Sequence, residues 1–305
     1  MSSRTNWIAV DWGTSNLRAW GIGYDGAVTF VSTSDKGMGR LTPDGYPAAL
    51  SEVLAGHYEG ASGDVLISGM AGARQGWMEA PYLDAPADLR GLVEGAISPP
   101  MPSGGLRVRI LPGVCQKAPG SENVMRGEET QLLGLSRIVP GYAGPVCMPG
   151  THSKWALVEG ARLASFTTAM TGELYELLRQ YSLLRQSLEG ETEGPKRAEG
   201  FRAGLDMGIA KPQDLTSRLF TLRAASLLSG RGADWCDGYL SGLLIGAEVG
   251  ARKELIGTGD IPVIGSPMLS MLYAEAIERL GGKARIIDAA DATLAGLRAA
   301  REFSS

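Results

Sequence analysis

The sequence IAVDWGTSNLRAW, residues 8–20, has two apolar runs separated by a short turn rich in Gly, Thr, Ser and Asn. Apolar runs on both sides of such a turn predict a β-hairpin. We expect its glycine to supply a tight turn with a positive φ, and its amides and hydroxyls to donate hydrogen bonds to phosphate. Asp11 ends the first predicted strand and is a candidate metal ligand; the alternative is that it caps the turn. The candidate phosphate ligands are Gly13, Thr14, Ser15 and Asn16.

A second hairpin of the same kind is predicted for VCMPGTHSKWALV, residues 146–158. His152 has no obvious carboxylate partner in the sequence, so a binding or structural role is favoured over that of a base. Arg18 and Lys154 lie on the strands that leave the two hairpins. Each either neutralises phosphate or lies on the surface, and the sequence leaves both open. The candidate phosphate ligands of the second hairpin are Gly150, Thr151, His152 and Lys154.

The strands around each hairpin follow the same order, which predicts a duplicated fold. A third strand follows an acidic-Gly turn in both halves, at Asp25-Gly26 and at Glu159-Gly160. Strands and helices alternate in the rest of each half. We therefore expect an α/β protein whose two similar halves face one nucleotide.

The composition is ordinary for a soluble globular protein and disfavours several functional classes. With 305 residues, the chain is expected to form two domains. A formal charge of -4 and a pI of about 5.4 disfavour a general nucleic-acid-binding protein. Three widely spaced cysteines and two histidines indicate neither a disulfide framework nor a His-rich metal site. Because neither a signal peptide nor a membrane-spanning stretch is found, we expect a cytoplasmic protein without a membrane partner, and leave a homo-oligomer open.

The segment NVMRGEETQLLGLSRI, residues 123–138, predicts a loop followed by a helix that begins with two glutamates. Acidic residues in a first helical turn stabilise the helix by about 0.3 to 1 kcal/mol through its dipole, which alone accounts for both. The functional alternative is that Glu128 or Glu129 orients and deprotonates a hydroxyl group while Arg126 holds an anion.

Two glycine-rich segments, GMAGARQGW at residues 69–77 and KGMGR at residues 36–40, offer further candidate ligands. Each is either a binding loop whose arginine forms a forked pair with a carboxylate, or a packing loop with an exposed arginine. The candidate substrate ligands are Arg40, Gly72, Arg74, Trp77 and Arg126.

Glycine recurs at every fourth position of a predicted helix between residues 238 and 250. The bare face suits either tight packing of another helix or a flat ligand. The Gly265-Ser266 turn precedes a helix that begins at Pro267, and such a turn can meet a nucleotide. Thr171 is predicted to cap a helix that runs through Gln180. The candidate residues for contact with such a ligand are Gly242, Gly246, Gly265 and Ser266.

Six segments, in order along the chain, resemble signatures of the 2-dehydro-3-deoxygalactonokinase family, within the superfamily of actin, hexokinase and Hsp70. MPGTHSKW and MRGEETQ are specific strings, whereas the Asp-x-Gly-Thr hairpin alone identifies only the superfamily. The segments are AVDWGTSNLRAW (9–20), MAGARQGW (70–77) followed by APYL (80–83), NVMRGEETQLLG (123–134), MPGTHSKW (148–155), MTGELYELL (170–178) and SGLLIGAEV (241–249).

The resemblance implies two duplicated ribonuclease H-like domains, the actin-like ATPase fold, with an ATP and sugar cleft between them. The domains would be residues 1–139, joined by the C-terminal helix 288–305, and residues 140–287. The implied reaction is ATP-dependent phosphorylation of the C6 hydroxyl of 2-dehydro-3-deoxy-D-galactonate, in D-galactonate catabolism. The alternatives are an exopolyphosphatase-like phosphohydrolase of the same superfamily and a non-catalytic nucleotide- or sugar-binding regulator.

The resemblance also implies roles for the candidate residues. Asp11 would hold Mg²⁺ through water, and the two hairpins would bracket the β- and γ-phosphates of ATP. Glu128 would aim the nucleophile, with Glu129 as the alternative. The second hairpin has Met148 where other members of the superfamily often carry an acid, which places metal binding on the first hairpin. The candidates for binding the substrate carboxylate are Arg40, Arg74 and Arg126, and those for flanking adenosine are Gly265, Ser266 and the glycine-faced helix.

Overall fold

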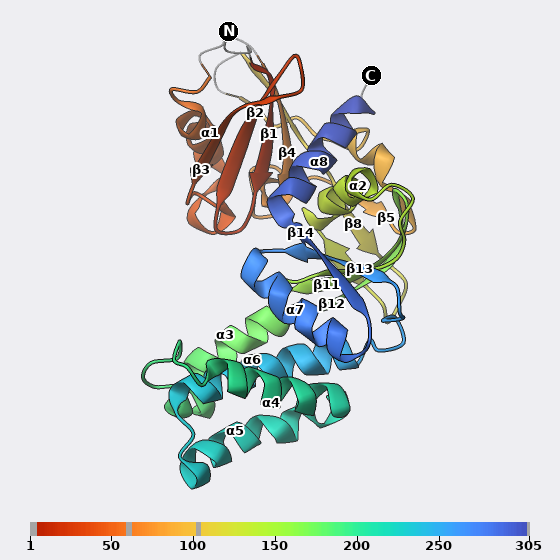
Figure 1. Ribbon diagram of the computed structural model, residues 1–305. Helices are drawn as coiled ribbons and strands as arrows, with labels where there is room; N and C mark the ends of the chain where they lie inside the picture. Colours follow the sequence, from red (N-terminus) through yellow and green to blue (C-terminus); the bar gives the residue numbers. More distant parts are fainter. Residues whose placement is uncertain (1–4, 59–62, 102–104, 304–305) are drawn as a thin grey trace. The chain divides into compact units, whose positions relative to one another are not determined.

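The computed structural model describes residues 5–58, 63–101 and 105–303. The chain divides into two compact units, each made of segments that are distant in the sequence (Figure 1). The last helix of the chain returns to the unit that contains the first strand. Unit 1 comprises residues 1–143, 157–165 and 289–305, and unit 2 comprises residues 144–156 and 166–288.

The central sheet of unit 1 has the strand order β3-β2-β1-β4-β7. The predicted hairpin is formed by β1 (Thr5–Trp12) and β2 (Leu17–Gly23), which are antiparallel, and β3 (Val28–Ser34) continues the meander. On the other side, β1 is parallel to β4 (Gly63–Gly69), which is parallel to β7 (Leu106–Ile110). A separate small sheet contains β5 (Tyr82–Asp84), β8 (Gly113–Gln116) and β9 (Asn123–Met125).

The second large sheet has strands in the corresponding order, β12-β11-β10-β13-β14; most of it belongs to unit 2, whereas residues 157–165, at the end of β11 and the start of β12, are grouped with unit 1. The two added strands are again parallel, because β10 pairs in parallel with β13 and β13 with β14. The expected duplicated α/β fold of the ribonuclease H-like type is therefore confirmed. The strands are β10 (Ala143–Met148), β11 (Ser153–Glu159), β12 (Arg162–Ala169), β13 (Asp260–Gly265) and β14 (Lys283–Asp288); the two-residue β6 (Ala87–Asp88) pairs with the start of β12.

Two helices of unit 1 lie side by side because glycine replaces a side chain at their contact (Figure 1). A Cβ on Gly134 of α2 (Glu128–Ile138) would lie 1.9 Å from the carbonyl oxygen of Ala292, and one on Gly296 of α8 (Ala289–Glu302) 1.9 Å from that of Thr130. The sheet core is covered elsewhere by α1 (Tyr46–Leu54). The C-terminal helix thus fixes the position of the helix that carries the two glutamates.

The glycine-faced helix of unit 2 packs in the same way. Its four glycines, at every fourth position of α6 (Ala233–Gly250), face α4 (Arg197–Ala210). A Cβ on Gly242 would lie 2.0 Å from the carbonyl oxygen of Phe201. Of the two interpretations of this face, tight helix packing is the one observed. The other helices of unit 2 are α3 (Thr171–Tyr181), α5 (Leu215–Ser229) and α7 (Pro267–Arg279).

The prediction that Thr171 caps α3 is wrong. The N-cap position is Met170, with no side-chain cap bond, and Thr171 is the first residue of the helix. Its hydroxyl instead donates a hydrogen bond to the buried carboxylate of Glu248. The Thr171 hydroxyl thus bonds a residue that is distant in the sequence and does not cap its own helix.

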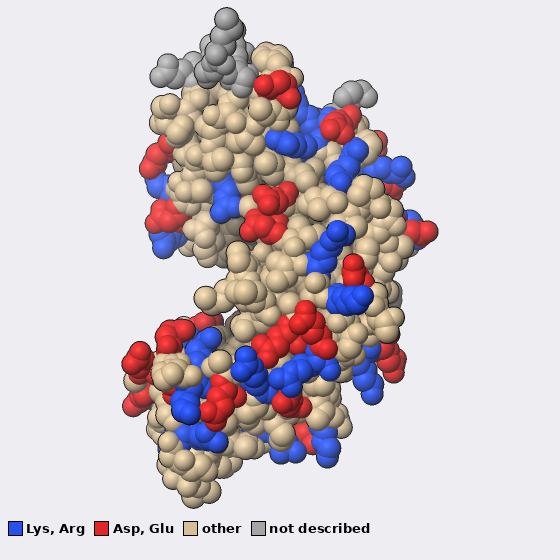
Figure 2. Space-filling view, in the orientation of Figure 1, with Lys and Arg blue, Asp and Glu red and all other residues tan. Residues whose placement is uncertain are grey.

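In the part of the chain that the structure describes, no helix combines the length and apolar character needed to cross a bilayer. On the face of the molecule in Figure 2, acidic and basic side chains are interspersed rather than gathered by sign.

Candidate active site

The first hairpin turn, residues 13–16, is closed by the amide of Gly13, which donates to the carbonyl oxygen of Asn16 at 2.8 Å. The expected positive φ is wrong, because neither Gly13 nor Gly150 of the second hairpin is among the glycines with positive φ in the described residues. A Cβ on Gly13 would lie 3.3 Å from the carbonyl oxygen of Asn16, so glycine here provides room for the turn. Thr14, Ser15 and Asn16 are exposed, as phosphate-binding residues must be.

The KGMGR segment, residues 36–40, packs against the backbone of this hairpin turn. The amides of Met38 and Gly39 donate to the carbonyl oxygens of Gly13 and Thr14 at 3.0 and 2.9 Å. A Cβ on Gly37 would lie 2.4 Å from the carbonyl oxygen of Thr14, so a side chain there would displace the turn. The packing interpretation of this segment is therefore the one observed, and sequence reasoning did not foresee that its target is the hairpin.

Asp11 lies near the end of β1, and its carboxylate has an unusual electrostatic environment. Burial, offset in part by Arg18 and reinforced by the negative charge of Glu128, raises the pKa of Asp11 to about 6. Among the described residues, no hydrogen bond joins its carboxylate to the hairpin backbone, so the turn-capping alternative is not observed. Glu128 lies close enough to repel Asp11, although 117 positions separate them in the sequence.

The raised pKa of Asp11 makes a testable prediction about stability. The pKa of Asp11 is 3.8 in the unfolded reference and about 6 in the folded protein. The folded state is therefore most stable when Asp11 is protonated: this stability is fully present below pH 3.8 and is lost as pH rises through 6. Asp11→Asn cannot ionise, so it does not lose this stability. Without metal or nucleotide, we expect the variant to melt higher than the wild type at pH 8, with a smaller gap at pH 4.5. Calorimetry at both pH values checks this, and a gap that grows toward low pH would contradict the burial of Asp11.

The helix α2 presents the two glutamates differently. Glu129 is 1% exposed, and its two carboxylate oxygens accept from the amide of Gly127 at 2.9 and 2.7 Å. Burial and the charge of Glu128 raise the pKa of Glu129 to about 7. Glu128 is only half-buried, accepts from the amide of Arg126 at 3.0 Å, and is the glutamate whose charge acts on Asp11. Glu129 therefore caps its own helix, whereas Glu128 is placed to act beside Asp11.

Arg126 has an unusual environment for a cation. Its Nη2 donates to the carbonyl oxygen of Ala80 at 2.8 Å, and its Cζ lies 4.3 Å from the centre of the Tyr82 ring. Its Nε and Nη1 are buried and have no hydrogen-bond partner. Gly72 makes room for it, since a Cβ there would lie 2.8 Å from Nη1. Two unused donors on a fixed guanidinium are the geometry expected of an anion-binding group.

The other candidate substrate ligands are placed less favourably. Arg40 forms an ion pair with Asp35 on the surface, and Arg74 is exposed. Trp77 is a core residue, 8% exposed, whose ring packs against those of Trp12 and Tyr46. The expectation that Trp77 contacts substrate is corrected to core packing, which its position after a glycine-rich loop did not reveal.

The second hairpin is also supported from behind, here by the start of α3. The amide of Glu173 donates to the carbonyl oxygen of Thr151 at 3.0 Å, as Gly39 does to Thr14 in unit 1. His152 pairs with the Glu173 carboxylate, so the expectation that it lacks a carboxylate partner is wrong. Lys154 is 5% exposed rather than on the surface, and its Nζ donates to the carbonyl oxygen of His152 at 3.4 Å.

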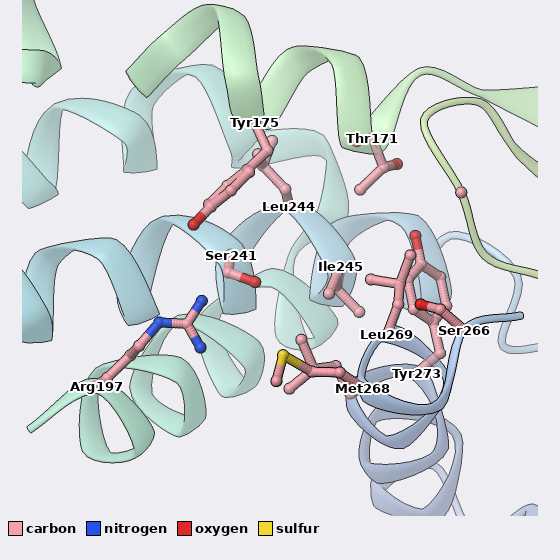
Figure 3. A pocket seen from close by; sticks show the side chains of 13 residues that line it. Thr171, Tyr175, Arg197, Ser241, Leu244, Ile245, Ser266, Met268, Leu269 and Tyr273 are labelled. Atoms are coloured by element: carbon pink, nitrogen blue, oxygen red, sulfur yellow. The ribbon is translucent and has the colours of Figure 1, made fainter. Parts of the chain in front are cut away.

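A mainly apolar hollow of about 690 Å³, including its open mouth, adjoins this hairpin at Gly150. Tyr175 and Arg197 lie toward one end and Ser266 and Tyr273 toward the other (Figure 3). A pocket of this size with a few polar groups suits an aromatic base and a sugar. It is lined by Gly150, Thr171, Gly172, Tyr175, Arg197, Ser241, Leu244, Ile245, Ser266, Met268, Leu269, Leu272 and Tyr273.

The residues predicted for the adenosine side differ in whether they border this pocket. Ser266 lines it, but Gly242 and Gly246 do not, because their bare face is filled by the backbone of α4. Gly265 is not among the lining residues; a Cβ there would lie 2.9 Å from the Ser270 hydroxyl. Another side of α6, with Ser241, Leu244 and Ile245, faces the hollow. These three residues lie between the glycines in the sequence. Because they are on a different side of the helix from Gly242, helical periodicity could have identified them.

A duplicated ribonuclease H-like fold with a supported Gly-Thr hairpin in each half is the fold of the actin, hexokinase and Hsp70 superfamily. The comparisons with known proteins agree. The profile of the 2-keto-3-deoxy-galactonokinase family matches residues 11–300, so the chain belongs to this family. The resemblance found in the sequence is thereby confirmed.

Individual relatives match over nearly their whole length. DgoK1 of Rhizobium meliloti (strain 1021), which is named a probable 2-dehydro-3-deoxygalactonokinase, is 38% identical over 98% of each chain. The 2-dehydro-3-deoxygalactonokinase of Escherichia coli (strain K12) is 35% identical over 96% of each chain. A crystal structure from Sinorhizobium meliloti, assigned to the same activity, has a TM-score of 0.89 and 39% identity, covering 97% of this chain and 96% of that one.

Proposed function

We propose that this protein transfers the γ-phosphoryl group of ATP to the C6 hydroxyl of 2-dehydro-3-deoxy-D-galactonate, giving the 6-phosphate ester and ADP. The reaction would belong to D-galactonate catabolism in the cytoplasm. Family membership supports a sugar-acid kinase. The observation that carries the proposal lies in unit 1: the charge of Glu128 acts on Asp11, and Arg126, two positions before Glu128, has a guanidinium with unused donors.

We assign Glu128 the role of base in this reaction. As the substrate C6 oxygen bonds to the γ-phosphorus, the bond from that phosphorus to the β,γ-bridging oxygen breaks and ADP leaves. The hydroxyl proton passes to the Glu128 carboxylate. Such transfer depends mainly on positioning and charge neutralisation, so a half-buried carboxylate held at its helix N-terminus suffices.

We assign the substrate carboxylate to Arg126. The orphan Nε and Nη1 each have an N–H group available to a carboxylate oxygen, whereas Arg40 is already paired with Asp35. Because both nitrogens are closed off from solvent, the Tyr82 ring that covers the guanidinium must move when substrate binds. Arg74 and Gly72 complete the proposed sugar side.

The residues present fit a magnesium ion. Mg²⁺ is usually held by one or two protein carboxylates, with waters and substrate phosphates completing the shell. In the described ranges no group of three or more His, Cys, Asp or Glu side chains could hold a metal alone, and Asp11 with its neighbour Glu128 is of the sparse kind that Mg²⁺ uses. Asp11 would hold the ion, which would neutralise charge on the phosphates.

We assign the nucleotide phosphates to the hairpin residues Gly13, Thr14, Ser15 and Asn16 and Gly150, Thr151, His152 and Lys154. The adenosine would occupy the hollow beside Gly150, with Ser266 at its wall.

A coupled assay of ADP formation tests the proposal. With Mg-ATP and a panel of 2-keto-3-deoxy sugar acids, we expect turnover that depends on the sugar acid. Comparable phosphate release without the acid would instead indicate the phosphohydrolase alternative, and nucleotide binding without turnover of any acid would indicate the regulator.

A further inference from the structure

A buried carboxylate in unit 2 has no part in the proposed reaction. Glu248 is 6% exposed and lies in the last turn of α6. A negative charge is unfavourable at the C-terminal end of a helix, because the helix dipole is negative there. Burying an ionised carboxylate adds a further desolvation cost unless hydrogen bonds compensate for it. A residue held in so unfavourable a place needs a specific explanation.

Four donors from three other elements converge on this carboxylate. Its Oε1 accepts from the Ser153 hydroxyl at 2.7 Å and from Nε1 of Trp155 at 2.8 Å. Its Oε2 accepts from the Tyr273 hydroxyl at 2.6 Å and from the Thr171 hydroxyl. Burial, and then the charge of Glu248, hold the pKa of Tyr273 well above its usual range, so this hydroxyl remains a donor.

These donors belong to the structures that surround the second hairpin. Ser153 is the residue directly after the turn, and Thr171 begins α3. The next residue of α3, Gly172, touches the hairpin closely enough that a Cβ would lie 2.6 Å from the carbonyl oxygen of Gly150. Tyr273 and Thr171 also line the hollow beside Gly150. One carboxylate thus ties the exit strand of the hairpin, the helix behind it and the pocket wall together.

We propose that Glu248 is a positioning residue that fixes the Gly150-Thr151 hairpin and the start of α3 for binding of nucleotide phosphates. The inference rests on the proposed function in that the ligand is ATP or ADP. A carboxylate suits this position because its two oxygens accept four hydrogen bonds at once.

Two substitutions of Glu248 separate the effect of its hydrogen bonds from the effect of its side-chain volume. In Glu248→Gln, the amide oxygen can accept from Ser153 and Trp155, while its NH₂ donates to the hydroxyls of Thr171 and Tyr273, so the network survives. In Glu248→Leu, the volume is similar but all four donors lose their acceptor. Leu240→Ala is the matched stability control: Leu240 is fully buried on the same helix, packs in the helical cluster and does not line the pocket.

The experiment measures the affinity of the full chain for Mg-ADP by calorimetry, with KM for each substrate and the melting temperature. For Glu248→Leu we expect Mg-ADP affinity and KM for ATP to worsen about tenfold to a hundredfold, as misplacement of a binding loop by about 1 Å can cause. KM for the sugar acid should stay near the wild-type value. Glu248→Gln should keep Mg-ADP affinity near the wild-type value. Leu240→Ala should lower the melting temperature and leave Mg-ADP affinity unchanged.

Folded Glu248→Leu that binds Mg-ADP as the wild type does would overturn the inference, as would an equal loss in Leu240→Ala. If Glu248→Leu does not fold, Ser153→Ala removes one donor directly after the hairpin turn, at a residue that does not line the pocket, and must weaken Mg-ADP binding on its own. Wild-type protein that fails to bind Mg-ADP would overturn the proposed function itself, so the two failures are distinguishable.

Discussion

Glu128→Gln is expected to lower kcat by about a thousandfold, within the range for loss of a positioned general base. KM for ATP should change little, because Gln preserves size and the carbonyl that accepts from the Arg126 amide. Steady-state kinetics with ATP and the sugar acid check both values. Since a half-buried glutamate at a helix N-terminus is not a core residue, the melting temperature should stay close to that of the wild type.

Glu129→Gln is the matched control for this prediction. Glu129 is buried and bonds the amide of its own helix start, so its variant should alter stability more than turnover. A large loss of kcat in Glu129→Gln with near-normal turnover in Glu128→Gln would transfer the role of base to Glu129. Loss in neither variant would remove general-base catalysis by α2 from the mechanism.

Arg126→Met is expected to lower kcat/KM for the sugar acid by about a hundredfold, while KM for ATP stays unchanged. The loss corresponds to hydrogen bonds between charged groups, which contribute about 1.5 to 3 kcal/mol each. The free energy of unfolding of Arg126→Met should not be lower than that of the wild type. Two buried donors without partners cost about 1 to 3 kcal/mol each, and Met removes that penalty while filling the space beneath Tyr82.

The kinetics are compared with those of Arg137→Met, which removes an exposed arginine that pairs with Glu302 at the other end of α2. That variant should be kinetically normal. The C1 amide of the sugar acid gives an independent check, because Arg126→Met should lose most of the preference for the acid over the amide. A preserved preference would show that another cation, such as Arg74, binds the carboxylate.

Features that depend on local sequence were predictable. Both hairpins follow from apolar runs around Gly-Thr turns, and their repetition predicted the antiparallel three-stranded meander that both large sheets contain. The first-turn position of Glu128 and Glu129 followed from the pattern of the helix. In each case the information lies within about ten consecutive residues, where turn chemistry and periodicity act.

Features that depend on distant partners were not predictable. Glycines predicted to face a ligand face α4 instead, because nothing in one helix shows what lies against it. Likewise, Glu173 as the partner of His152, and the four donors to Glu248, come from positions 21 to 95 residues away. Trp77 was misassigned because an aromatic ring after a flexible loop suits a core as well as a sugar site.

The most direct test of the proposed reaction is to locate the transferred phosphate. The wild-type protein is incubated with Mg-ATP and 2-dehydro-3-deoxy-D-galactonate, and the products are examined by ³¹P and ¹³C NMR. We expect one phosphate ester per ADP formed, with phosphorus coupling to C6 of the sugar acid. Free orthophosphate in place of the ester, or an ester at any other carbon, would contradict the account.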